Sequence, residues 1–134
     1  MTHDEIADKL IDWATTHKAV RALWIEGADP RALRRPYGNL ELHIAADEPD
    51  FPALLEEVSA GLPPLPGSRV LSVADTQRFA KELAVEAGGS RFLLIVEQTN
   101  LLAKRPRAEV VPFVDKTRHL THVMDFSRRK VIQP

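Results

Sequence analysis

The chain has 134 residues, 44% hydrophobic and 28% charged, which is enough for one domain built around one core. Eighteen Lys and Arg residues against nineteen Asp and Glu residues give a formal charge of -1, which argues against the positive field that non-specific nucleic-acid binding needs. The longest apolar run (92–96), the acidic N-terminus and the absence of cysteine argue against a membrane span, a signal peptide and thiolate chemistry, so we expect a soluble cytoplasmic protein without nucleic-acid or membrane partners.

Helix and strand patterns alternate in the first part of the chain. Thr2 and Glu5 form a capping box ahead of apolar residues at helical spacing, which predicts a helix to about His17. The apolar stretch 22–25 ends at a Gly- and Pro-containing loop and indicates a buried strand. Strict alternation over 39–44 predicts a second strand, with Leu and Ile on one face and polar residues on the other.

The remainder of the chain predicts one more helix and several strands. Asp50 is the expected N-cap of a helix whose apolar positions between 51 and 62 share one face. Residues 68–74 form an expected strand, and 82–97 read as a hairpin that turns at two glycines. A further strand follows at 110–114. These elements predict an α+β domain over residues 1–126, with a last strand or short helix at 120–126 and a loose tail at 127–134.

The loop between the first two strands carries the pattern that bears on function. Gly27 and Ala28 end the first strand, and Asn39 and Glu41, two residues apart on the second strand, begin twelve residues after the glycine. This layout resembles the minimal catalytic domain of the polymerase-beta-like nucleotidyltransferases, in particular the aminoglycoside adenylyltransferases. In that family Gly-Ser ends the first strand and Asp-x-Asp lies on the second.

Two later segments extend the resemblance over nearly the whole chain. Residues 89–94 are similar to the family's strand that carries a third aspartate, whose position here is Leu93, and residues 112–117 are similar to a segment near the end of the domain. The resemblance implies a mixed sheet with helices packed on one side. It also implies a site for Mg²⁺ and a nucleoside triphosphate, in which clustered carboxylates hold the metal and small residues let backbone N–H groups approach phosphates.

This sequence departs from the family pattern at the metal ligands. Ala28 lacks the serine hydroxyl, Asn39 replaces the first aspartate, and Leu93 cannot bind a metal, which leaves Glu41 as the one retained carboxylate and a weak metal ligand. The resemblance therefore implies the fold but argues against the activity. We expect a degenerate, catalytically inactive domain that needs no cofactor and binds a nucleotide, another small anion or a protein partner.

Three arginines lie in the loop between the first two predicted strands. Arg31, Arg34 and Arg35 lie in the loop beside the phosphate position that the resemblance implies, where they could clamp an anion or simply be solvated. The resembled adenylyltransferases carry a helical second domain beyond this length. A face that such a domain would cover is a candidate surface for homodimer formation.

Three alternatives stay open at this point. Residual Mg²⁺-dependent nucleotidyl transfer to a small hydroxylated acceptor could survive if Glu26 or Asp29 assists Glu41. Glu41 and His43 share a strand face, where they could bind a metal or form a partly solvated polar surface. The chain could also be a small-ligand binder or isomerase with the cone-shaped α+β barrel of the ketosteroid isomerase type, which would require helix rather than strand over residues 20–26.

Overall fold

A computed structural model describes residues 1–26, 40–76, 80–104, 110–116 and 118. In these residues the helices are α1 (His3–Thr16) and α2 (Phe51–Ser59), with short 3-10 turns η2 (Glu48–Asp50) and η3 (Thr99–Lys104). The strands are β1 (Ala22–Glu26), β2 (Glu41–Ala46), β3 (Arg69–Thr76), β4 (Ala80–Ala87), β5 (Ser90–Gln98) and β6 (Val110–Asp115).

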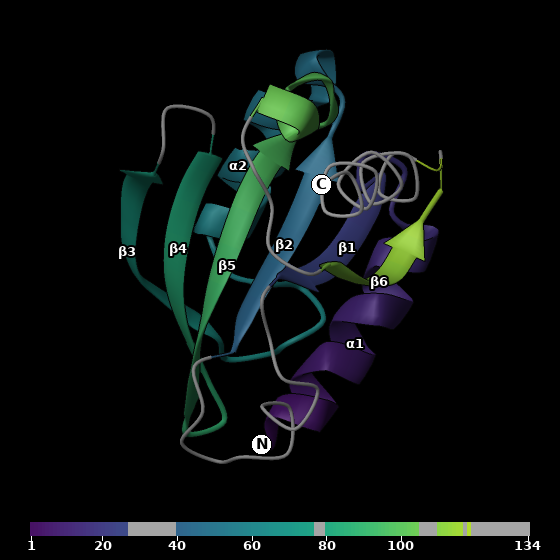
Figure 1. Ribbon diagram of the computed structural model, residues 1–134. Coiled ribbons are helices and arrows are strands. Elements are labelled where there is room, and N and C mark those ends of the chain that lie inside the picture. The colour runs from purple at the N-terminus through teal and green to yellow at the C-terminus, as the bar shows by residue number, and fades with distance from the viewer. Residues whose placement is uncertain (27–39, 77–79, 105–109, 117, 119–134) are drawn as a thin grey trace, which may run out of the picture.

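The strands form one mixed sheet in the order β3-β4-β5-β2-β1-β6 (Figure 1). The β2–β5 pair is parallel and every other neighbouring pair is antiparallel. The prediction of an α+β fold is therefore confirmed. The strand at Ala22–Glu26 also counts against the cone-shaped barrel, which needs a helix at that place.

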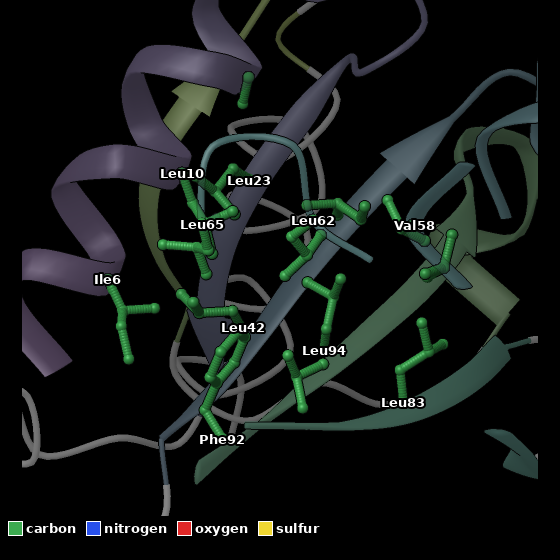
Figure 2. Close-up of a cluster of buried hydrophobic side chains, with 14 of the residues drawn as sticks. Ile6, Leu10, Leu23, Leu42, Val58, Leu62, Leu65, Leu83, Phe92 and Leu94 are labelled. Atoms are coloured by element: carbon green, nitrogen blue, oxygen red, sulfur yellow. The ribbon is translucent and has the colours of Figure 1, made fainter. Parts of the chain in front are cut away.

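One face of the sheet and both helices build the main core. Alternate residues of the central strands point to this face, and apolar residues of α1 and α2 pack on them (Figure 2). Its labelled members are Ile6, Leu10, Leu23, Leu42, Val58, Leu62, Leu65, Leu83, Phe92 and Leu94. The intervening residues of the same strands point to the opposite face, where a second cluster contains Ala22, Trp24, Ala45, Leu102 and Val110.

The ends of the two helices illustrate which local signals operate. At α1, the Glu5 N–H donates to Thr2 Oγ1 at 3.1 Å, as the capping box predicts. At α2, the expected cap is wrong in detail, because Asp50 makes no side-chain hydrogen bond to the helix and has αR backbone angles. The preceding 3-10 turn already provides the first helical turn, because the N–H of Phe51 donates to the carbonyl of Asp47 at 3.0 Å.

The predicted glycine hairpin joins β4 to β5. Gly88 and Gly89 have φ values of +53° and +82°, the left-handed region that a tight hairpin turn requires. The N-terminal ammonium of Met1 donates to the carbonyl of Gly88 at 2.8 Å, and the Ser90 hydroxyl donates to the Met1 carbonyl. The hairpin thus anchors the start of α1 from a position far along the sequence.

Several predictions fall outside the described residues. They concern the loop that follows β1, the segment 120–126 and the tail 127–134. The 3-10 turn η3 was not predicted from the sequence. In the parts of the chain that the structure describes, no helix is long and apolar enough to span a bilayer.

Candidate functional site

The most distinctive polar feature lies on the face of the sheet opposite the helices. His43, in the middle of β2, has Nδ1 2.6 Å from Glu97 Oε2 on β5 and Nε2 3.1 Å from Glu41 Oε2 on its own strand. Glu41 and His43 face the same way because they are two residues apart on a strand. Glu97 joins them because the parallel β2–β5 register pairs His43 with Ile95 and so places Glu97 diagonally across.

We call this cluster the Glu41–His43–Glu97 triad. Two of its side chains are buried and the third is exposed to solvent. The side chains of His43 and Glu97 are each 3% exposed, whereas that of Glu41 is 41% exposed. The indole of Trp24 on β1 stacks on the His43 ring, with centroids 5.3 Å apart and planes inclined by 24°. The sequence-based expectation of a solvated polar face therefore holds for Glu41 but is wrong for His43.

The geometry specifies how the buried polar groups are satisfied. Both ring nitrogens of His43 face carboxylate oxygens, an arrangement that an imidazolium satisfies with its two N–H donors. A carboxylate at 3% exposure is tolerated only with such a charged, hydrogen-bonded partner. Glu41 is thus held by a contact with the buried His43 ring, 3.1 Å from its Nε2. Among the described residues no group of three or more His, Asp or Glu side chains has a geometry that could hold a metal.

The structure shows directly how Leu93 on β5 lies relative to Glu41 on β2. In the parallel register, Glu41 on β2 pairs with Leu93 on β5, and Leu93 is partly exposed. A residue at position 93 and a residue at position 41 are thus neighbours on adjacent strands, about 5 Å apart. The two sequence-predicted positions that the structure describes come together on one face.

The other predicted site residues cannot be assessed in the same way. Gly27, Ala28, Asp29, Arg31, Arg34, Arg35 and Asn39 lie outside the described residues, and only the backbone of Glu26 is described. Glu97 is the functional candidate that sequence reasoning missed. In the sequence Glu97 is simply the first charged residue after the apolar run 92–96, and this pattern does not show that its side chain is buried.

A second polar cluster joins residues that flank the ends of β1, β2, β5 and β6. The Thr99 hydroxyl donates to Asp47 Oδ1 at 2.6 Å, and Arg21 Nε lies 3.4 Å from Asp47 Oδ2. Lys116 donates to the carbonyl of His17 at 2.6 Å. Partial burial, and secondarily the charge of Arg21, lowers the pKa of Lys116. These contacts connect five elements or their flanks, and we assign them a structural role.

Comparison with protein-family models gives no match for this chain, and comparison with curated proteins gives none either.

Proposed function

We propose that this chain is a nucleotidyltransferase-like domain that has lost nucleotidyl transfer and binds a nucleotide or a related phosphate anion without a metal ion. The observation that carries the proposal is the pairing of Glu41 with Leu93 on adjacent parallel strands. In the resembled family, a carboxylate on each of these strands would share a metal. Here one of the two positions is a leucine.

The state of Glu41 supports the same proposal. Its carboxylate meets the His43 ring at 3.1 Å, and His43 is held from behind by the buried Glu97. The His43 ring thus occupies a contact with Glu41 that a metal ligand would need to be free to give up. Sequence alone adds Arg31, Arg34 and Arg35 as cationic side chains for an anion.

Restoring the missing carboxylates tests the assignment of positions. The double variant N39D/L93D restores an aspartate at each of the two positions where the resembled family has one and this chain does not, and we expect it to gain Mg²⁺ binding in calorimetry. The control N39D/S72D adds the same two charges, but Ser72 is exposed on β3, on the same face and three strands from Glu41, or ~14 Å away. Equal Mg²⁺ binding by both variants, or by neither, would contradict the assignment.

Titrations of the wild-type protein test the activity itself. We expect ATP, GTP or inorganic triphosphate to bind with an affinity that does not increase when Mg²⁺ is added, and we expect no transfer of labelled AMP to hydroxylated acceptors. Transfer that disappears in E41A would show retained catalysis and overturn the inactive reading. Absence of binding to all three compounds, with a protein copurifying instead, would favour a partner-binding module.

A further inference from the structure

Two cationic residues lie side by side where β1 begins and β6 ends. The N–H of Lys116 donates to the carbonyl of Arg21 at 2.9 Å, on the neighbouring strands β1 and β6 (Figure 1). Ala22 faces away from the helices, so alternation turns Arg21 toward the helix side of the sheet. Lys116 reaches the same side, because its Nζ donates to the carbonyl of His17 at the end of α1, at 2.6 Å. We call these two residues the Arg21–Lys116 pair.

The guanidinium of Arg21 has donors that the described residues do not satisfy. Arginine carries five N–H donors. The contact of Arg21 Nε with Asp47 Oδ2, at 3.4 Å, lacks the geometry of a hydrogen bond, and Nε is buried without a hydrogen-bond partner. The side chain as a whole is 34% exposed, so part of it is accessible to a ligand from solvent.

Lys116 also has donors to spare. Its ammonium carries three, of which the His17 carbonyl accepts one, and the residue is exposed. Partial burial, and secondarily the charge of Arg21, lowers the pKa of Lys116. The second cause shows that the two positive charges are close enough to repel each other. Lys18, which is also exposed, directly follows His17 and adds positive charge to the same region.

The carboxylates near the Arg21–Lys116 pair are already engaged. Asp47 is 42% exposed, and its Oδ1 accepts a hydrogen bond from the Thr99 hydroxyl at 2.6 Å. Glu57 contacts the ring of His17 at 2.7 Å. Among the described residues, Asp47 is thus the carboxylate that offsets the charge of the pair, and one positive charge is left over. Positive charge in excess at a partly solvated place favours an anion.

We infer that the Arg21–Lys116 pair is a binding site for a phosphate-type oxyanion, which the guanidinium and the ammonium hold together. Arginine supplies directional N–H donors to such an anion and lysine supplies a compact charge on a flexible stem. The site goes beyond the proposed function, because Arg21 precedes β1 whereas Gly27 follows it, and the five residues of this strand span ~17 Å. Both cations are partly solvated, so we expect a dissociation constant on the order of 1 mM.

A titration with inorganic phosphate at constant ionic strength, followed by backbone amide NMR signals, tests the site. The signals of Arg21 and Lys116 should move in the wild type, and R21Q and K116Q should each weaken binding roughly tenfold. D47N removes the competing negative charge and keeps an oxygen acceptor for the Thr99 hydroxyl, so it should strengthen binding roughly threefold. A cluster with a purely structural role gives no such gain.

Matched controls remove one arginine and one lysine elsewhere. R69Q and K81Q change β3 and β4, at the opposite edge of the sheet from β6, and should leave phosphate affinity unchanged. Circular dichroism confirms that each variant is folded. Signals of Arg21 and Lys116 that do not move, equal losses in R21Q and R69Q, or a folded D47N without a gain would refute the site.

A second titration with O-phosphoserine distinguishes the source of the phosphate group. Tighter binding of the ester than of inorganic phosphate, at the same amide signals, assigns a phosphate ester as the ligand, and the reverse assigns free phosphate. ATP binding that R21Q leaves unchanged belongs to the proposed function instead. The two proposals therefore fail independently of each other.

Discussion

Replacing Glu97 by alanine removes the buried carboxylate of the Glu41–His43–Glu97 triad. His43 is 3% exposed and would lose the acceptor that lies 2.6 Å from its Nδ1. Breaking a buried ion pair by deleting one partner costs about 3–5 kcal/mol, because the other charge is left in a poorly solvated place. The Nδ1 side of the buried His43 ring is then left without this partner, and we expect a loss near the lower end of that range, about 3 kcal/mol.

Replacing Glu41 by alanine is the matched control, because it removes the other carboxylate on the same imidazole. Glu41 is 41% exposed, and its contact with His43 is longer, at 3.1 Å. A solvent-exposed ion pair contributes about 0.2–1 kcal/mol, so E41A should cost less than about 1 kcal/mol. E97Q keeps a hydrogen-bond acceptor of the same shape and should fall between the two alanine variants.

Urea unfolding followed by circular dichroism measures these differences, with an unchanged m-value as the check that the unfolded state is the same. For E97A the expected loss corresponds to a decrease of roughly 10 °C in Tm. The double variant H43A/E97A should cost about 2 kcal/mol less than the sum of the single variants, because the two residues share one interaction. If E97A costs no more than E41A, the buried pair does not stabilise the fold as argued.

Two further substitutions test the hairpin and a surface ion pair. G88A places a Cβ 2.8 Å from the Met1 Cβ and keeps φ at +53°, so it should lower the free energy of unfolding by about 2 kcal/mol in thermal unfolding. G89A, with φ at +82° and open space around it, should lower it by about 1 kcal/mol. Equal losses would mean that the Met1 contact is unimportant. The hydrogen bond and charge of Arg69 lower the pKa of Glu86 below its ordinary value of 4.5. Ionised Glu86 therefore stabilises the fold above that value, and the Tm advantage of the wild type over E86Q should shrink as the pH falls through the lowered pKa; an advantage independent of pH would contradict this linkage.

Local sequence signals were sufficient where an element depends on its own residues. The Thr2 cap, the alternation that predicts β2 and the glycine pair that turns β4 into β5 each act within a few residues. The 3-10 turn before α2 shows the limit of such signals. Asp50 is a good capping residue by type. Its backbone is already helical, however, and its side chain makes no capping hydrogen bond.

In the candidate site, too, local signals identified some residues and missed others. Glu41 could be selected from its place in a recognisable spacing, and its strand face could be assigned from alternation alone. The partner of His43 could not be identified from the sequence, because Glu97 is 54 residues away in the chain. Nothing local to residue 97 distinguishes a carboxylate that enters the protein from one that leaves the end of a strand.

The sequence by itself thus predicted both α-helices and most of the strands, and it placed Glu41 and His43 on one face of a strand. Only the tertiary structure established that β2 and β5 lie parallel and adjacent, which pairs Glu41 with Leu93 and brings Glu97 to His43. The physical reason is that secondary structure depends on short-range backbone and side-chain preferences. The neighbours of a strand depend on how the whole sheet buries its apolar faces, and that choice is made by residues distant in the chain.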